Sequence, residues 1–303
     1  MNKREQRKFD THYDKFIQRL TLKGYSSATI SSYSRAIRRL ASFFDQCPDK
    51  RLTKDNFEAY FSELHKTHSW STIKCDRNGI MHYWELVLEL DWKWVNIVKA
   101  PKTKHLPDIL TPEEITRLLS CVHNTRYRVF LYVVYTLGLR LSEALYLQVG
   151  DIDGKTKRVH IHDGKGCKDR FVILPDNTYL ALRQLWQTHH HPLWIFPSFQ
   201  PSRHDTPMDK GSVQRAMQLA VIEANIHKHI SIHSLRHCFA THSIEGGMDL
   251  CSLQKLLGHE SPKTTAIYTQ LTEQVQRNNH NIVNEFVTKI PQPKCCGEND
   301  DEN

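Results

Sequence analysis

The sequence predicts a mainly α-helical protein with a small antiparallel β-sheet, and three observations predict this fold class. Apolar residues recur at helical spacing in the first third of the chain, and helix start and stop signals punctuate the rest. Two short strand patterns around a glycine-containing turn are confined to residues 158–174. The 303 residues exceed the roughly 100–200 residues of a usual domain, so we expect two domains.

Residues 1–98 are predicted to form a bundle of four or five short helices, because neither strand alternation nor internal repeats appear there. The most regular helix carries apolar residues on one face from Ile30 to Phe44, and Ser26 or Ser27 is placed to cap its start. Residues 99–107 contain two prolines and three lysines and offer little to bury. They are predicted to be a linker.

Residues 108–288 form the expected second domain, which opens with a strong helix start. Thr111 suits the N-cap, Pro112 the first helical position, and Glu114 completes a capping box. An apolar helix is expected to end at Gly138, which can take the left-handed conformation that closes a helix. Gly258 is placed to end a later helix in the same way.

The predicted sheet is a hairpin late in the first half of the second domain. Residues 158–162 and 170–174 have strand character, and the turn Asp163-Gly-Lys-Gly166 lies between them. At the other end of the domain, residues 289–303 are polar and acidic. We expect this tail to be disordered.

The charge of the chain favours an anionic partner. The formal net charge is +8, and residues 1–105 hold 20 Lys and Arg against 12 Asp and Glu, whereas residues 106–303 hold 21 of each kind. The excess therefore lies in the first third of the chain. On charge alone, nucleic-acid binding and a merely solvated basic surface are about equally plausible.

Several classes of protein are disfavoured. No apolar run approaches the ~18 residues of a membrane span, and the start MNKREQRKFD lacks the apolar stretch of a signal peptide. The eight cysteines contain no CxxC pair, which fits neither a zinc ribbon nor a secreted disulfide scaffold. The run His189-His190-His191 is expected to be a solvated loop, since consecutive histidines do not share one helix face. We expect a cytoplasmic protein with free thiols, no metal site and no cofactor.

Four short segments contain residues that suit attack on a phosphodiester. They are Gly138-Leu-Arg140-Leu-Ser-Glu143, Gly164-Lys165-Gly166, His233-Ser-Leu-Arg236-His237, and Gly258-His259 followed nine residues later by Tyr268. The guanidinium groups of two arginines can hold the two non-bridging phosphate oxygens. Histidine and lysine can move the protons of the attacking and leaving oxygens.

Tyr268 is a reasonable nucleophile, because a phenol with a pKa of about 10 is more acidic than an alcohol and leaves more easily in the reverse step. A phosphotyrosyl link would conserve the energy of the cleaved bond, so strands could be resealed without ATP. Consistent with this, Gly164-Lys165-Gly166 is not a Walker P-loop. Taken alone, Tyr268 is more often a core tyrosine of a helix that begins at Ser261-Pro262.

These segments resemble the tyrosine recombinases, the family of the phage integrases, Xer recombinases and Cre. The resemblance covers nearly the whole chain, from Tyr25-Ser-Ser-Ala-Thr-Ile-Ser-Ser-Tyr33 to Tyr268, and includes Thr136-Leu-Gly-Leu-Arg-Leu-Ser-Glu-Ala-Leu145 and Leu256-Leu-Gly-His259. It implies an N-terminal helical, SAM-like core-binding domain over residues 1–98 and a recombinase catalytic domain over residues 108–288. Every catalytic position of the family is occupied.

The resemblance implies a role for each position. Arg140 and Arg236 would clamp the phosphate, Lys165 would be the general acid, and Tyr268 the nucleophile. His233 would assist proton transfer and His259 would hydrogen-bond the scissile phosphate; Glu143 would buttress the site, and His237 would be the less critical histidine beside Arg236. Lys155, Lys157 and Lys168 lie near the turn, but its Gly-Lys-Gly setting favours Lys165.

The implied function is site-specific recombination, in which DNA strands are cleaved and rejoined through a 3′-phosphotyrosyl intermediate and a Holliday junction without ATP or metal. The implied partners are double-stranded recombination sites and a homotetramer on DNA, or a tetramer shared with a related recombinase, and no membrane. Three alternatives remain: a transposase, a type IB topoisomerase-like strand transferase, and a non-catalytic DNA-binding regulator. The action of any of them would place the protein at the nucleoid.

One further surface is a candidate for DNA contact. Arg35, Arg38 and Arg39 are spaced at i, i+3 and i+4, so they share a face of the most regular helix of the basic first domain. Most such stripes are merely solvated. Because the charge excess lies in this domain, we expect these arginines to meet phosphates.

Overall fold

The structure is a computed structural model that describes residues 1–93, 107–164, 168–200, 202 and 205–268. The chain divides into two compact units, Met1–Lys104 and His105–Asn303, each with its own hydrophobic core. Most of the expected linker, Lys165 in the hairpin turn and the expected tail lie outside the described residues. The mainly helical fold class with one small antiparallel sheet is confirmed.

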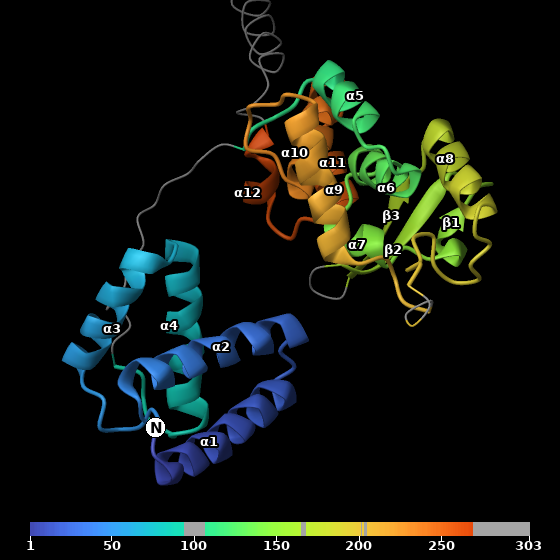
Figure 1. Ribbon diagram of the computed structural model, residues 1–303. Coiled ribbons are helices and arrows are strands. Elements are labelled where there is room, and N and C mark those ends of the chain that lie inside the picture. Colours follow the sequence, from blue (N-terminus) through green and yellow to red (C-terminus); the bar gives the residue numbers. More distant parts are fainter. Residues whose placement is uncertain (94–106, 165–167, 201, 203–204, 269–303) are drawn as a thin grey trace, which may run out of the picture. The chain divides into compact units, whose positions relative to one another are not determined.

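The first unit is a bundle of helices in its described part (Figure 1). Its helices are α1 (Lys3–Leu22), α2 (Ser27–Phe44), α3 (Lys54–Thr67) and α4 (Trp70–Leu86). The cap of α2 is Ser26, whose side chain accepts the backbone N–H of Thr29. Helix α2 packs along α4, where a Cβ on Gly79 would lie 3.1 Å from the Cα of Tyr33. The missing side chain allows the two backbones to approach closely.

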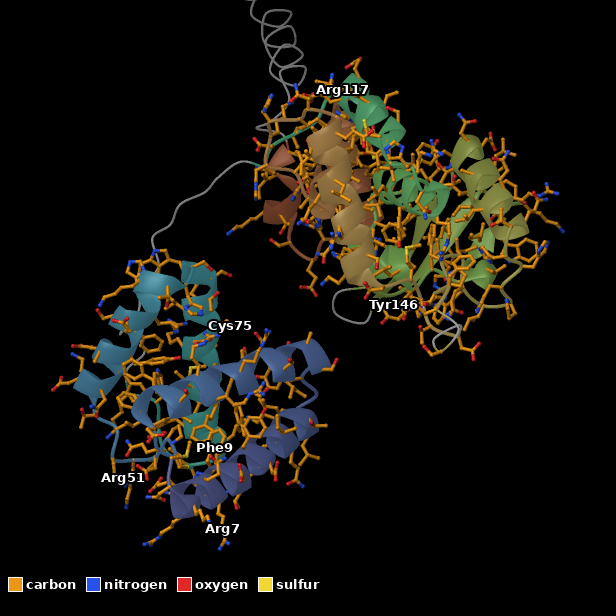
Figure 2. The ribbon with its side chains drawn as sticks, viewed as in Figure 1. Arg7, Phe9, Arg51, Cys75, Arg117 and Tyr146 are labelled. Carbon is orange, nitrogen blue, oxygen red and sulfur yellow. The ribbon has the colours of Figure 1, made fainter. Side chains whose placement is uncertain are left out.

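Aromatic side chains fill the interior of this bundle. Phe16, Phe57 and Tyr83 are completely buried, and Phe16 and Tyr83 meet edge to face with ring centroids 5.5 Å apart. Phe9 on α1 is buried, whereas Arg51 lies on the outside of the bundle (Figure 2). The amphipathic pattern of the sequence therefore produces a two-sided helix surface, apolar inward and charged outward.

The second unit places helices around a small sheet (Figure 1). The helices are α5 (Pro112–Ser120), α6 (Thr125–Thr136), α7 (Leu141–Leu145), α8 (Asp176–Gln187), α9 (Lys210–Glu223), α10 (Ile232–Glu245), α11 (Leu250–Leu257) and α12 (Pro262–Thr265). Helix α6 is central, since it packs on α5, α7, α8, α9 and α10. Its residues Phe130, Leu131, Val133 and Val134 are completely buried.

The sheet contains β1 (Ile152–Asp153), β2 (Arg158–Gly164) and β3 (Lys168–Ile173), in that order and antiparallel. Its register pairs Val159 with Val172 and Ile161 with Arg170, and it shifts between Ile161 and Gly164. Val159, Ile161 and Val172 all face the core. The hairpin therefore has one buried face on which a charged residue such as Arg170 needs a partner.

Two predicted helix signals are confirmed in this unit. The Thr111–Glu114 capping box opens α5 with both of its hydrogen bonds. Gly138 follows α6 with φ of +59°, and a Cβ there would lie 2.4 Å from the ring of Phe239. Both the backbone conformation and the contact require glycine, and Arg140 follows two residues later. None of the described helices is long and apolar enough to cross a membrane.

Candidate active site

The centre of the site is the carboxylate of Glu143, whose side chain is only 5% exposed. Glu143 lies in the first turn of α7, where its Oε2 accepts the backbone N–H of Arg140 at 2.7 Å and so caps the helix. Its Oε1 accepts a hydrogen bond from the guanidinium of Arg140 at 2.6 Å. The turn that begins α7 therefore holds Arg140 against Glu143.

Two further arginines approach the same carboxylate from other elements. Arg170 on β3 donates one hydrogen bond to each oxygen of Glu143, both at 2.8 Å, in the bidentate geometry that matches guanidinium to carboxylate. Arg236 on α10 lies 3.7 Å from Oε2. Three guanidinium groups therefore surround one carboxylate.

This arrangement sets the protonation of the cluster. Burial acts to raise the pKa of Glu143, but the hydrogen bonds and charges of Arg170 and Arg140 outweigh it and lower that pKa to about 2. Burial, followed by the charge of Arg140, lowers the pKa of Arg236 to about 10. At neutral pH Glu143 is ionised and Arg236 is protonated, so the cluster carries more positive than negative charge.

The same arginines also satisfy the end of α11. Arg170 Nε donates to the carbonyl of Leu256 at 2.8 Å, Arg236 to that of Leu257 at 2.6 Å, and Arg140 to that of Gly258 at 3.0 Å. The last carbonyls of a helix have no partner within the helix and carry partial negative charge. Gly258 ends α11 with φ of +64°, and His259 follows it directly.

His237 and His259 adjoin this cluster. Tyr268 Oη lies 2.9 Å from His237 Nδ1, and His259 Nδ1 lies 2.9 Å from the hydroxyl of the fully buried Thr265. Burial lowers the pKa of His237 to about 4, with help from His233 and Arg236. Burial and the charges of Arg236 and Arg140 lower the pKa of His259 to about 4 as well. Both imidazoles are therefore neutral at pH 7.

His233 packs against His237, with ring centroids 4.6 Å apart. Burial and the charges of Arg236 and Arg140 lower its pKa. His237 Nδ1 and the Tyr268 hydroxyl share one hydrogen bond, whose donor depends on which nitrogen of the neutral imidazole carries the proton. Of the two neighbouring histidines on α10, the one named as less critical by family resemblance is the partner of the tyrosine.

Tyr268 lies three residues beyond the end of α12 at Thr265, and not within that helix as its sequence context suggested. Its side chain is 2% exposed, and its ring stacks on that of His259 with an interplanar angle of 16°. Burial raises the pKa of Tyr268, while the charges of Arg236 and Arg140 act to lower it. The tyrosine is thus docked in the interior, next to the arginines.

The second unit brings together seven of the residues singled out from sequence: Arg140, Glu143, His233, Arg236, His237, His259 and Tyr268. Lys165 lies outside the described residues. Sequence reasoning missed Arg170 and Thr265. Arg170 was detectable in principle, because it shares the core-facing side of its strand with Val172 and a buried arginine requires a buried acid.

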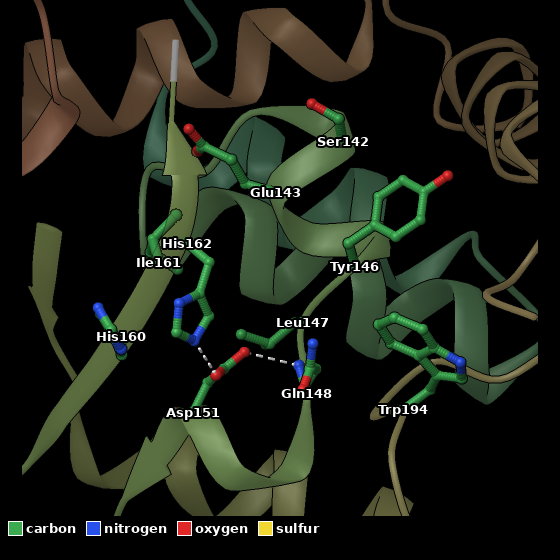
Figure 3. Close-up of a pocket in the computed structure, with 10 residues that line it drawn as sticks. All are labelled: Ser142, Glu143, Tyr146, Leu147, Gln148, Asp151, His160, Ile161, His162 and Trp194. Atoms are coloured by element: carbon green, nitrogen blue, oxygen red, sulfur yellow. Dashed lines mark hydrogen bonds and ion pairs between the residues drawn. The ribbon is translucent and has the colours of Figure 1, made fainter. Parts of the chain in front are cut away.

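A pocket of about 320 Å³ opens beside Glu143 and is lined by Tyr146, Asp151, His162 and Trp194 among others (Figure 3). Within the described residues, one group of three side chains, His160, His162 and Asp169, lies close enough to hold a metal ion. No member of this group is in the arginine cluster.

The histidine run lies in a turn after α8, as expected, but only His190 is exposed. His191 is 4% exposed, and its Nδ1 accepts the backbone N–H groups of Leu193 and Trp194. His189 is partly buried and bonds the carbonyl of Ile195. These two imidazoles form hydrogen bonds with backbone groups of the turn, which explains why they are buried.

Replacement of Glu143 by Gln should destabilise the protein by about 3–5 kcal/mol, because it leaves three buried or half-buried arginines without their counter-charge. The measurement is urea unfolding. Glu223→Gln is the matched control: it removes a carboxylate from the exposed pair with His123 and should cost no more than about 0.5 kcal/mol. Equal losses in the two variants would contradict the central role of Glu143.

Stability should fall as pH is lowered from 7.5 to 5. His237 and His259 have folded pKa values of about 4, below the usual 6.5, so the unfolded chain takes up protons in this window that the folded chain refuses. Their contribution is complete above pH 6.5 and disappears toward pH 4. We expect about 1–2 kcal/mol per histidine after solvent screening.

The pH effect can be assigned by difference. His259→Asn should flatten the dependence of the unfolding free energy on pH, whereas His227→Asn at an exposed position should leave it unchanged. His162 works in the opposite direction, because its hydrogen bond with Asp151 raises its pKa. Identical profiles for wild type and His259→Asn would refute the assignment.

Comparison with known proteins connects this site to a family. Residues 108–275 match the phage integrase family, and residues 13–94 match the N-terminal SAM-like domain of phage integrases. A putative integrase/recombinase of Sinorhizobium fredii is 32% identical over 255 residues, covering 83% of this chain and 82% of the relative. The tyrosine recombinase XerC of Chlamydia muridarum is 31% identical over 244 residues, 76% of each chain.

Solved structures show the same fold. A lambda integrase dimer bound to a core site superposes with a TM-score of 0.70 at 17% identity, covering 86% of this chain and 94% of the other. XerH bound to its difH substrate in a post-cleavage complex gives 0.67 at 21% identity, covering 84% and 80%. The family match spans more than half of the chain and includes the whole described arginine cluster with Tyr268. The chain therefore belongs to the phage integrase family and is a tyrosine recombinase.

Proposed function

We propose that this protein is a site-specific recombinase that cleaves and rejoins double-stranded DNA with Tyr268 as nucleophile, forming a 3′-phosphotyrosyl intermediate. The observation that carries the proposal is the arginine cluster around Glu143, which adjoins a tyrosine held by His237. Strand exchange through a Holliday junction within a tetramer completes the proposed reaction. DNA is then the substrate, and the place of action is the nucleoid in the cytoplasm.

The charge of the cluster supports a phosphate as its ligand. Arg140, Arg170 and Arg236 face a single carboxylate, so positive charge remains uncompensated in a poorly solvated site. Arg140 is the most accessible of the three, with 22% of its side chain exposed against 8% for Arg170 and 1% for Arg236. We assign Arg140 to the first contact with the scissile phosphate, and Arg236 to its other non-bridging oxygen once the site opens.

The proposed step conserves atoms and charge. Tyr268 Oη bonds to phosphorus as the bond from phosphorus to the 5′-oxygen breaks, and the phenolic proton passes to a neutral imidazole or to solvent. The 5′-oxygen takes a proton from a general acid, the role assigned to Lys165. His259, neutral and hydrogen-bonded through Nδ1, keeps Nε2 to contact the phosphate. Reversal of the step by another 5′-hydroxyl reseals the strand.

A change in the position of Tyr268 is part of the proposal. A side chain that is 2% exposed cannot reach a phosphate of a duplex, and its hydroxyl is engaged by His237. We infer that DNA binding releases this hydrogen bond and turns the phenol toward the arginines. The docked tyrosine would limit cleavage to the assembled complex.

Related solved structures support the proposed partners. They include XerH in a post-cleavage complex with its difH substrate and a lambda integrase tetramer on a Holliday junction. Transposition is the nearest alternative, because the Tn1549 transposon integrase in complex with transposon DNA has the same fold with a TM-score of 0.66. Topoisomerase-like relaxation would use the same chemistry without strand exchange.

The nucleophile can be tested with a nicked suicide substrate that traps a covalent adduct. Wild type should form a labelled adduct that survives denaturing electrophoresis, and Tyr268→Phe should reduce it at least 1,000-fold while DNA binding persists. Tyr135→Phe is a matched control, because Tyr135 makes the same kind of hydrogen bond, 2.9 Å to His242 Nδ1 on α10. It should retain the adduct.

The other outcomes separate the alternatives. An adduct that persists in Tyr268→Phe would mean that another residue attacks. DNA binding by wild type without any adduct would favour the regulator. Relaxation of supercoiled DNA that lacks a recombination site would favour the topoisomerase-like enzyme.

We propose that the basic first unit provides a second DNA-binding surface. Arg35 and Arg38 are exposed on α2, as the charge stripe requires. Arg39 differs: it donates at 2.7 Å to the carboxylate of Asp76, which is 4% exposed. We therefore assign phosphate contact to Arg35 and Arg38 and a mainly structural role to Arg39.

The double variant Arg35→Ala/Arg38→Ala should lower the steepness of log K against log[salt] for duplex binding by about two units, since each lost phosphate contact contributes about 0.9. Fluorescence anisotropy over a salt series measures it. Lys54→Ala, in the exposed pair with Glu58, should keep the wild-type slope. An unchanged slope in the double variant would remove this face from the DNA contact.

A further inference from the structure

We propose that His160, His162 and Asp169 form a binding site for a zinc-class divalent cation that fastens β2 to β3 next to the hairpin turn. The three side chains lie on one face of the hairpin, two residues apart on β2 and across the ladder on β3. None of them takes part in the phosphodiester chemistry proposed above. The stability of the β2–β3 hairpin would then depend on the bound metal.

The distances fit a metal. His160 Nε2 lies 3.2 Å and His162 Nδ1 3.6 Å from the same oxygen, Oδ2 of Asp169. Ligands about 2.0–2.1 Å from a tetrahedral zinc ion are separated by about 3.3 Å. All three ligand atoms lie within 4.8 Å of one another. A cation can therefore enter between them with small side-chain rotations.

The ring of His162 is already oriented as a metal ligand. Its Nε2 lies 2.7 Å from Oδ1 of Asp151, and a carboxylate can only accept, so this nitrogen carries a proton. In the neutral imidazole, Nδ1 then offers a lone pair on the side of Asp169. Asp151 belongs to the 3-10 turn Val149–Asp151, is 7% exposed, and is itself fixed by the backbone N–H of Gln148 (Figure 3). Metal-binding histidines usually donate their second ring nitrogen to such a carboxylate.

The ring of His160 is held as well. It stacks on Phe171 with ring centroids 4.7 Å apart and an interplanar angle of 17°. The two imidazoles lie with centroids 3.9 Å apart. This arrangement keeps both rings over the same side of the hairpin, where the candidate ligands remain accessible from solvent: His160 is 29% exposed and Asp169 is 52% exposed.

The ligand set selects the kind of cation. Two imidazoles and one carboxylate suit Zn²⁺, Co²⁺ or Ni²⁺ better than Mg²⁺ or Ca²⁺, which prefer oxygen ligands alone. Three protein ligands leave a further position for water or another oxygen ligand. A cation there would join the two strands through coordinate bonds and restrict their separation.

The test uses the full-length protein, stripped of metal with a chelator and titrated with Zn²⁺ by calorimetry. The double variant His160→Ala/His162→Ala should bind one Zn²⁺ fewer per chain than wild type, and the exposed control His227→Ala should bind as many. Asp151→Asn keeps all three ligands and should weaken this site by about 10–100-fold. Zn²⁺ should slow amide hydrogen exchange in residues 158–164 and 168–173 of wild type but not of the double variant.

Co²⁺ absorption distinguishes the ligands. Wild type should show d–d bands of a nitrogen- and oxygen-ligated ion that are missing in the double variant. Equal Zn²⁺ stoichiometry in wild type and the double variant would overturn the proposal. So would Co²⁺ spectra that show only thiolate charge transfer, because the metal would then lie on cysteines.

Discussion

The buried carboxylate of Glu143 is the interaction on which the second unit depends. Three arginines from the α6–α7 turn, β3 and α10 converge on it, and none of these cations could remain in a poorly solvated interior without that counter-charge. Stability alone does not account for a buried ion pair of this kind, because an apolar cluster of equal volume often gives the same free energy of unfolding. Its excess of guanidinium groups is better explained by a function that needs a fixed, dry, cationic surface.

The end of α11 makes this cluster part of the fold. The carbonyl groups at the end of α11 have no partner within the helix. Each accepts a hydrogen bond from one arginine: Leu256 from Arg170, Leu257 from Arg236 and Gly258 from Arg140. Each guanidinium group is therefore held on two sides. Arg140 and Arg170 also donate to Glu143, and Arg236 also donates to the carbonyl of Gly138. Since Gly258 leads directly into His259, the same contacts that orient the arginines also position the histidine that stacks on Tyr268.

Local signals in the sequence predicted the elements of the fold, and the order of the Arg, His, Glu and Tyr residues predicted which side chains the second unit brings together. The Thr111 capping box and the left-handed glycines Gly138 and Gly258 depend on neighbouring residues only, which is why they were predictable. The bond between Arg170 and Glu143 and the bond between His237 and Tyr268 join residues 27 and 31 positions apart. Such contacts depend on tertiary packing. The strand pattern could indicate that Arg170 is buried, but it could not identify Glu143 as its partner, nor His237 as the partner of Tyr268.

Burial and the neighbouring arginines act on the pKa of Tyr268 in opposite directions. Burial raises the pKa of the phenol, whereas Arg236 and Arg140 act to lower it, and the hydroxyl lies 2.9 Å from Nδ1 of a neutral His237. A phosphate that bound the arginines would offset their charge and compete for their hydrogen-bond donors. The cluster would then bind the negatively charged transition state more tightly than the ground state, because the transition state concentrates charge on the oxygens that the arginines face. The arginines would thus contribute in the same way to cleavage and to resealing, since both directions pass through the same pentacoordinate phosphorus.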